Sequence, residues 1–231
     1  MKAMILAAGL GQRMRPLTDH LPKPLLRVKG KTLLDYHLEK IQQAGIQEVI
    51  INLAYLGEKI REHLQQHPYP QLKIIFSQEP EPLETGGALL HAADLLGDED
   101  FLLVNGDVWS DINYQKIIEH KPNLNQLGHL VLVANPDFHP QGDFVLNTST
   151  QLLQEKQQQQ QGFTFSGISI LSPQLVENYS GKRIKFPLVE ALREAIAQKK
   201  LTGELYCGHW SDVGTPERLS DLDNFLQTLH Q

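Results

Sequence analysis

The chain has little cysteine and no long apolar run, and both shortages limit where it can work. Cys207 is the only cysteine among 231 residues, so a secreted domain stapled by internal disulfides is excluded. The apolar run at residues 3–10 is followed at once by Arg13 and Arg15, unlike a signal peptide with its small-residue cleavage site. No stretch approaches the ~20 apolar residues that a membrane-spanning helix needs. We therefore expect a cytoplasmic protein without a membrane partner.

Positive charge is also in short supply. The sequence has 21 Lys and Arg against 27 Asp and Glu, which gives a net charge of −6. A surface that binds nucleic acid is normally basic, so no nucleic-acid partner is expected. A nucleotide ligand is compatible with this charge, because a few local cations and a divalent ion suffice to bind it. The length and the 41% apolar content predict one globular domain over residues 1–231.

Two common phosphate-binding fingerprints are missing, since the chain has no G-x-x-x-x-G-K-[S/T] and no G-x-G-x-x-G. The first 25 residues nevertheless indicate a phosphate ligand. A short apolar strand leads into Gly9 and Gly11, and Arg13, Arg15 and Lys23 follow closely. Glycines after a strand leave backbone N–H groups open to an anion, and the cations add charge there. The pattern predicts a loop that holds a polyphosphate.

Strand-like and helix-like segments alternate through the first half of the chain. Apolar, β-branched runs predict strands at 2–7, 49–53, 72–76 and 101–104, and apolar residues at helical spacing lie between them. This rhythm predicts a parallel sheet covered on both faces, with ligands beyond the carboxyl ends of its strands.

The second half of the chain is less regular. We expect strands, some of them antiparallel, at 130–134, 143–146 and 163–171. Helices are predicted at 187–198 and 215–229, and the five glutamines at 157–161 predict a solvated loop. His63 and His67 are four apart on a predicted helix, which favours a solvated face over a metal site.

Two aspartates stand where such a sheet gathers its ligands. Asp107 follows the apolar run 101–104, and Asp212 lies in W-S-D-V-G-T, ahead of the last predicted helix. Mg²⁺ prefers oxygen ligands, typically one or two carboxylates with phosphate and water oxygens. Each aspartate alone could equally serve a turn or a helix cap. Both are candidates for a metal site.

The N-terminal sequence L-A-A-G-L-G-Q-R-M-R-P-L-T, followed by P-K-P, resembles the signature of the sugar-1-phosphate nucleotidyltransferases. Members of that family join a nucleoside triphosphate to a sugar 1-phosphate and release pyrophosphate. The resemblance covers essentially the whole chain. It implies an α/β fold, a single Rossmann-like, glycosyltransferase-A-like domain with a mixed, mostly parallel central sheet flanked by helices. Residues 1–111 would mainly bind the nucleotide, and residues 112–231 would mainly bind the sugar and supply a closing helix.

The resemblance also implies roles for single residues. Arg13, Lys23 and Asp107 would be catalytic, and Asp107 with Asp212 would hold Mg²⁺, or alternatively Mn²⁺. The residues that would bind the nucleotide are Leu6, Ala7, Ala8, Gly9, Gly11, Gln12, Arg13, Lys23, Glu79, Thr85 and Gly86. The residues that would bind the sugar are Asn105, Gly142, Asp143, Glu155, Ser166 and Gly167.

Two positions depart from the family pattern. Glu79 stands where many relatives have a glutamine that accepts the N3–H group of a uracil. A carboxylate can accept that proton as well, so uracil stays the expected base. The family's usual N-x-G-I pattern appears here as Phe165-Ser166-Gly167-Ile168, so the asparagine that relatives place beside the sugar is missing.

The compact length narrows the expected activity. Only a short segment follows Val213-Gly214-Thr215, without the hexapeptide-repeat β-helix of members that also acetylate. The compact form resembles uridylyltransferases of cell-wall sugar recycling, so the expected substrates are UTP and a sugar 1-phosphate, bound by a monomer or small homo-oligomer. Arg183 and Lys185 are candidates to bind a carboxylate on such a sugar. Two alternatives stay open, a glucose- or mannose-1-phosphate nucleotidyltransferase and a non-catalytic nucleotide-binding regulatory module.

Overall fold

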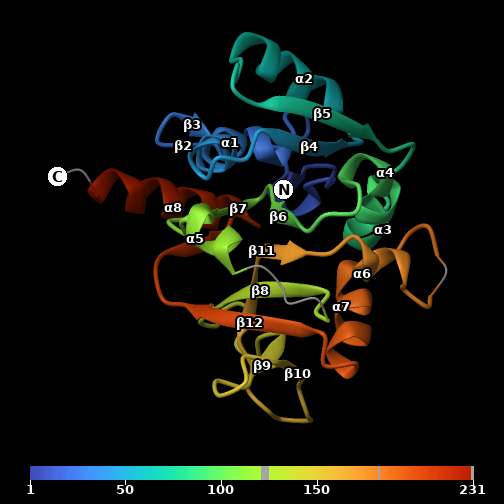
Figure 1. Cartoon of the computed structure of the whole chain (residues 1–231). Helices are drawn as coiled ribbons and strands as arrows, with labels where there is room; N and C mark the ends of the chain where they lie inside the picture. The colour runs from blue at the N-terminus through green and yellow to red at the C-terminus, as the bar shows by residue number, and fades with distance from the viewer. Residues whose placement is uncertain (121–124, 182, 230–231) are drawn as a thin grey trace.

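A seven-stranded sheet forms the centre of the molecule in the computed structural model, which describes residues 1–120, 125–181 and 183–229 (Figure 1). Its strand order is β12-β8-β11-β6-β1-β4-β5. The bounds are β1 (Ala3–Leu6), β4 (Glu48–Leu53), β5 (Lys73–Gln78), β6 (Phe101–Asn105), β8 (Gly128–Val133), β11 (Thr164–Leu171) and β12 (Leu201–Tyr206). β11 runs antiparallel to both of its neighbours, and the other pairs in this sheet are parallel. The expected mixed, mostly parallel sheet is confirmed.

Side chains that alternate along the strands supply one apolar core on each face of the sheet. In β1, Ala3 and Ile5 belong to one core and Met4 to the other, as the two-residue period of a strand requires. The helices of the first face are α1 (Leu33–Gln43), α2 (Gly57–Gln66) and α5 (Tyr114–Glu119). Those of the second face are α3 (Glu84–His91), α4 (Ala93–Leu96), α6 (Gln174–Glu177) and α7 (Leu188–Ala197). Burial on both faces removes apolar surface from water and stabilises the layered fold.

Two-stranded ribbons that are not paired with the central sheet are also present. They are β2 (Arg27–Val28) with β3 (Lys31–Thr32), β7 (Val108–Ser110) with β13 (Trp210–Asp212), and β9 (Phe144–Leu146) with β10 (Leu153–Glu155). The last helix, α8 (Pro216–Thr228), packs Leu222 and Leu226 on a third core that contains Trp109 and Val213. Thr215 caps this helix, and Pro216 occupies its first turn, where a missing N–H group costs nothing.

Most of the expected elements are present close to their expected bounds. The glutamine run 157–161 lies in an exposed loop, as expected. The short strands β2, β3, β7, β10 and β13 were not predicted, because two or three residues show no periodicity. The six-residue strand β12 of the central sheet was also not predicted. Among the described residues, no helix has both the length and the apolar content to cross a membrane.

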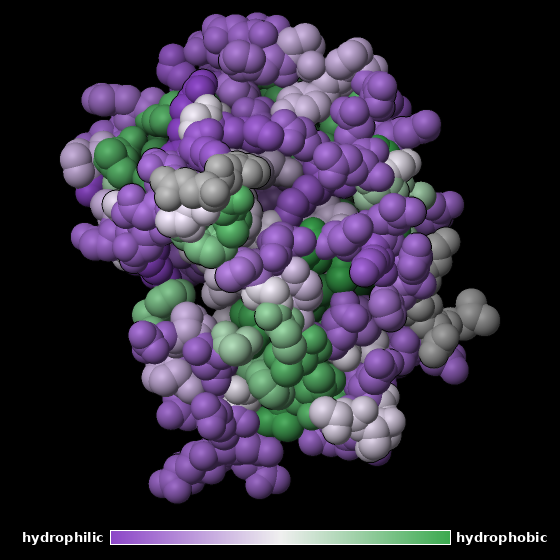
Figure 2. Space-filling model, turned by 90° about the vertical axis from the view of Figure 1, so that its left-hand side faces the viewer, coloured by the Kyte–Doolittle hydropathy of each residue, from purple (hydrophilic) through white to green (hydrophobic). Residues whose placement is uncertain are grey.

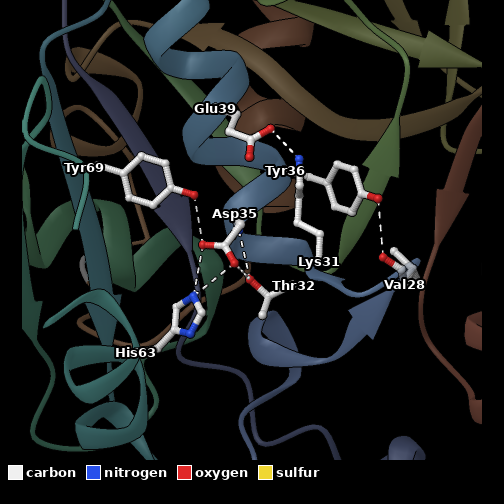
Figure 3. A network of polar contacts seen from close by, with 8 residues as sticks. All are labelled: Val28, Lys31, Thr32, Asp35, Tyr36, Glu39, His63 and Tyr69. Atoms are coloured by element: carbon white, nitrogen blue, oxygen red, sulfur yellow. Dashed lines mark hydrogen bonds and ion pairs between the residues drawn. The ribbon is translucent and has the colours of Figure 1, made fainter. Parts of the chain in front are cut away.

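The expectation of a solvated His63 was wrong. Its Nε2 lies 2.9 Å from Asp35 Oδ1, and the Tyr69 hydroxyl donates to the same oxygen (Figure 3). Burial alone would raise the pKa of Asp35, but hydrogen bonds from Thr32, His63 and Tyr69 hold that pKa below its usual value. These side chains join α1 to α2, and none of them is among the residues predicted to bind a ligand.

Candidate active site

A cleft of about 680 Å³ opens where β1, β4, β5 and β6 end. Parallel strands end at one edge of a sheet, so the loops after them converge there. The sequence-predicted residues that line this cleft are Leu6, Ala7, Ala8, Gly9, Gly11, Gln12, Arg13, Lys23, Glu79, Thr85, Asn105 and Asp107. Lys185, a candidate for the sugar carboxylate, lines it too.

Figure 2 shows the left-hand side of the molecule as drawn in Figure 1, where the chain leaves β12 toward α8. On this side, polar and apolar side chains gather in different parts of the surface. Hydrophilic side chains cover most of the upper part. Apolar side chains gather in the lower part, at the height of β8, β12 and the β9–β10 ribbon.

The glycine-rich loop after β1 is held in place by a buried side chain and a hydrogen bond. Residues Gln12–Met14 form a short 3₁₀ helix whose Met14 side chain is fully buried. Thr18 closes the loop, because its hydroxyl donates to the Gly11 carbonyl at 2.8 Å. Arg13 is exposed on the cleft side, while Arg15 pairs with Asp19 and does not line the cleft. Of the two arginines, only Arg13 lines the cleft.

Lys23 is buried and bonded to Asp107. Its Nζ lies 2.5 Å from Asp107 Oδ2, and only 8% of the residue is exposed. Pro22 and Pro24 flank it at the start of a 3₁₀ turn, Lys23–Leu25, and two prolines restrict the backbone that aims the side chain. The pair brings the P-K-P segment to the turn after β6, so a fixed positive charge stands at the predicted metal ligand.

Asp212 reaches the same place through the β7–β13 ribbon. It is paired in register with Val108, and the Val213 N–H group donates to the Asp107 carbonyl at 2.9 Å. Arg218 Nη1 lies 3.2 Å from Asp212 Oδ2. Burial raises the pKa of Asp212, and the negative charge of Asp107 raises it further against the opposing pull of Lys23 and Arg218.

This donor set suits a hard divalent cation. A carboxylate whose ionisation is opposed by burial and by a neighbouring carboxylate, as at Asp212, is stabilised by a positive ion beside it. Within the described residues, no three His, Cys, Asp or Glu side chains are arranged to hold a metal. Asp107 and Asp212 would therefore supply only part of the coordination shell, as is usual for Mg²⁺ that also binds substrate phosphate and water.

Asn52 is a cleft residue that the sequence analysis missed. Its Oδ1 accepts from the Ala7 N–H group at 2.7 Å, and its Nδ2 donates to Glu79 Oε1 at 2.7 Å. Glu79 Oε2 accepts from the Leu83 N–H group at 3.0 Å. An amide inside the apolar run V-I-I-N-L of β4 was the available signal, since a buried polar side chain needs partners.

Gly86 does not line the cleft, unlike the other residues predicted to bind the nucleotide. Its N–H group and that of Gly87 donate to the Phe186 carbonyl. A Cβ atom on Gly86 would lie 2.3 Å from Phe186 Cε2. The structure therefore gives this glycine a packing role, in which it lets the segment before α7 approach α3. Thr85 supports the same junction by accepting from the Leu188 N–H group.

The residues predicted to bind the sugar are scattered. Asn105 lines the cleft, and its side chain lies against Gly167, whose φ is +78°. Ser166 is fully buried, with its carbonyl accepting from Trp210 Nε1 at 2.8 Å. Asp143 Oδ2 accepts from the Phe165 N–H group at 2.8 Å.

Gly142 and Glu155 also lie outside the cleft lining. Gly142 adopts a φ of +62° beside Asn135, and Glu155 on β10 pairs with Arg193 at 3.5 Å. Arg183 is bonded to Glu190 and to the Tyr179 hydroxyl. Sugar contacts by Gly142, Asp143, Glu155, Ser166 and Gly167 stay predictions.

A second cleft of about 520 Å³ is lined in part by Asp212, one of the two candidate metal ligands. Val133, Ala134 and Phe138 form an apolar wall, and the Arg218 guanidinium lies 3.9 Å from the centre of the Phe138 ring. This cleft belongs to the half of the sheet that contains β8 and β12. A substrate at Asp107 and Asp212 can therefore extend toward either half.

Two known proteins are similar to this chain in sequence over nearly their whole length. An N-acetylmuramate alpha-1-phosphate uridylyltransferase from Neisseria meningitidis serogroup B is 42% identical over 224 residues, which is 96% of each chain. A D-glycero-alpha-D-manno-heptose 1-phosphate guanylyltransferase from Campylobacter jejuni is 30% identical, over 94% of this chain and 96% of that one.

Solved structures show the same fold. HddC from Yersinia pseudotuberculosis, complexed with GMP-PN, superposes with a TM-score of 0.78 at 26% identity, over 97% of this chain and 99% of that one. A putative glucose-1-phosphate thymidylyltransferase from Bacillus anthracis gives a TM-score of 0.85 at 19% identity, over 97% and 94% of the two chains. The family model described as Nucleotidyl transferase matches residues 2–228. With its glycine-rich loop, its buried lysine and its paired aspartates at one sheet edge, the chain belongs to the nucleotidyl transferase family.

Proposed function

We propose that this protein transfers UMP from UTP to N-acetylmuramate α-1-phosphate, giving UDP-N-acetylmuramate and pyrophosphate, in the reuse of cell-wall sugar. The observation that carries the proposal is the 42% identity, over 96% of both chains, with a relative named for that reaction. The reaction would take place in the cytoplasm, where UTP is present. Residues 1–111 would mainly hold the nucleotide and residues 112–231 mainly the sugar.

The chemistry requires little more than positioning and charge neutralisation. A phosphate oxygen of the sugar attacks the α-phosphorus, the bond to the β-phosphate bridge breaks, and pyrophosphate leaves in line. Arg13, with its planar fork of donors, suits the departing phosphates, and Lys23 supplies a compact charge beside Asp107. Both cations stabilise negative charge that shifts from the attacking to the leaving oxygens.

A divalent cation, Mg²⁺ or Mn²⁺, would be held by Asp107 and Asp212. When bound, it would supply charge neutralisation to phosphate oxygens. Lys23 and Arg218 already pair with these carboxylates, so the protein keeps both oxygen pairs oriented. Backbone N–H groups of the loop after β1 would orient the triphosphate, since glycine leaves them accessible.

The lactyl carboxylate of N-acetylmuramate calls for a cation near the sugar. Of the two sequence candidates, Arg183 is already bonded to Glu190 and Tyr179, whereas Lys185 lines the cleft beside Thr85. We assign the carboxylate to Lys185. Lys185→Met should raise KM for N-acetylmuramate 1-phosphate about 10-fold or more, the value of one charged hydrogen bond. KM for N-acetylglucosamine 1-phosphate should not change, and Arg183→Met should change neither; equal effects on both sugars would contradict the assignment.

Pyrophosphate release tests the whole proposal. The protein is incubated with UTP and Mg²⁺ and with the 1-phosphates of N-acetylmuramate, N-acetylglucosamine, glucose and mannose in parallel, with Asp107→Ala as the inactive control. Fast release with the N-acetylmuramate sugar supports the proposal. Pyrophosphate release only with the 1-phosphate of glucose or mannose would identify that sugar as the substrate in place of N-acetylmuramate. No release with any sugar and any nucleoside triphosphate would favour a non-catalytic nucleotide-binding module.

A further inference from the structure

Three adjacent parallel strands end beside one another at the nucleotide cleft, and two polar side chains connect their ends. Ala7 comes directly after β1, Asn52 lies near the end of β4, and Glu79 comes directly after β5. β4 is hydrogen-bonded to β1 on one side and to β5 on the other. Asn52 and Glu79 are 3% exposed, and both line the cleft. The side chains are therefore part of its wall.

Every hydrogen bond of this connection has a fixed direction. The backbone N–H group of Ala7 can only donate, so the Asn52 oxygen must face it and the Asn52 amino group must face Glu79. The Leu83 N–H group can also only donate, and it bonds the second oxygen of Glu79. Glu79 is thus an acceptor at both oxygens. A glutamine there could accept from only one of the two donors.

The connection joins the two loops that a nucleotide must bridge. Ala7 lies in the glycine-rich loop predicted to hold the phosphates, Leu83 lies in the loop that precedes α3, and both residues line the cleft. Each end is held by a backbone N–H group, and a buried amide and carboxylate span the space between. Losing one partner would leave a buried donor unsatisfied, which is the costly case.

We propose that Asn52 and Glu79 are positioning residues, which fix the distance between the glycine-rich loop after β1 and the loop that precedes α3. In this proposal Glu79 makes no hydrogen bond to the base. The proposal rests on the proposed function for its choice of UTP, and it replaces the expectation that Glu79 accepts the N3–H group of uracil. Base contacts then fall to the segment 82–85, which lines the cleft.

The two roles of Glu79 predict opposite results for Glu79→Gln. A glutamine can still accept from the N3–H group of uracil, so a base-reading residue would tolerate the change in UTP binding. Its amino group could also donate to N3 of cytosine, so the preference for UTP over CTP would fall. A positioning residue would instead lose a bond to Asn52 or to Leu83. UTP would then bind about 10-fold or more weakly, with the UTP to CTP ratio of affinities unchanged.

A double variant provides the decisive control. Asn52→Asp alone places two carboxylates together and should weaken UTP binding at least as much as Glu79→Gln. When Asn52→Asp and Glu79→Gln are combined, the introduced carboxylate would accept from the Ala7 N–H group. The introduced glutamine would donate its amino group to that carboxylate and accept from the Leu83 N–H group through its oxygen. All hydrogen bonds would be restored with their total charge unchanged.

Affinity for UTP and for CTP is measured by calorimetry with Mg²⁺ and no sugar, and kcat and both KM values by pyrophosphate release. We expect the single variants to raise Kd and KM for UTP, to leave KM for the sugar 1-phosphate unchanged, and to be rescued by the double variant. Wild-type affinity in Glu79→Gln, a lower UTP preference, or a double variant no better than the single ones would overturn the proposal. Because calorimetry needs no turnover, failure of the sugar reaction would leave this test intact.

Discussion

Lys40 carries a positive charge into the interior beside the β7–β13 ribbon, and this burial should be visible in the pH dependence of stability. Its Nζ donates to the Ser110 carbonyl and lies 5.7 Å from the centre of the Trp109 ring and 5.5 Å from that of Tyr114. Burial lowers the pKa of Lys40 from 10.5 to about 8, against a smaller upward pull by Asp111. The charged form is thus disfavoured in the folded state.

The size of the effect follows from the shift. One pKa unit corresponds to about 1.4 kcal/mol, so the step from 10.5 to about 8 corresponds to about 3 kcal/mol. Between these two values the unfolded chain binds more protons at this lysine than the folded one. The free energy of unfolding therefore rises with pH across this window. The cost of burying the charge is present in full below about pH 8 and is gone above about pH 10.5.

Lys40→Met removes this dependence. Urea unfolding is measured for the wild type and for Lys40→Met from pH 7 to pH 10.5, and the difference between their unfolding free energies is plotted. We expect the difference to move by about 3 kcal/mol in favour of the wild type. Other titrating groups cancel in it, and the lost bond to Ser110 gives a constant offset. Lys59→Met, at a side chain 49% exposed, is the control. Parallel curves for wild type and Lys40→Met would refute the reasoning.

Two further predictions concern the site. Asp107→Asn and Asp212→Asn should each lower kcat about 100-fold or more and raise the Mg²⁺ concentration needed for half-maximal rate, because each removes one charged ligand. Pyrophosphate release over a Mg²⁺ titration measures both quantities, and an unchanged Mg²⁺ requirement would contradict the metal assignment. Gly167→Ala should destabilise the fold by about 1 kcal/mol more than Gly30→Ala. Both glycines have a φ of +78°, but only at Gly167 would the new Cβ meet a side chain, Asn105 Nδ2 at 2.7 Å; equal melting temperatures for the two variants would show that Asn105 moves aside freely.

The sequence was informative where several chemical signals lie close together in the chain. Gly9, Gly11, Arg13 and Lys23 fall in one short segment, and each lines the cleft. Asp107 could be placed because it follows a strand whose apolar run ends abruptly. Position relative to a strand end is a reliable guide in a parallel sheet, because the topology then determines which edge the residue occupies.

Pairings over long distances could not be predicted. Asn52 gave one weak signal, a polar residue in an apolar strand, and nothing in the sequence names Glu79 as its partner. Asp143 and Ser166 stand in motifs shared with the family, yet their side-chain oxygens accept hydrogen bonds within the fold, from the N–H groups of Phe165 and Ile168. Gly86 shows the same ambiguity, because a glycine required for packing looks identical in sequence to one required by a ligand.

The β7–β13 ribbon has a consequence for how the protein comes into being. It pairs Val108 with Asp212, so the two proposed metal ligands belong to segments made early and late in synthesis. Contacts between such distant segments carry a large loop-closure entropy and form slowly. A chain still on the ribosome can fold its first parallel strands and its glycine-rich loop, and so expose the surface proposed to bind phosphate. It acquires the second carboxylate only when the last strand is released. Nucleotide binding without turnover is therefore the expected property of a nascent or C-terminally shortened chain, and divalent-ion affinity reports completion of the fold.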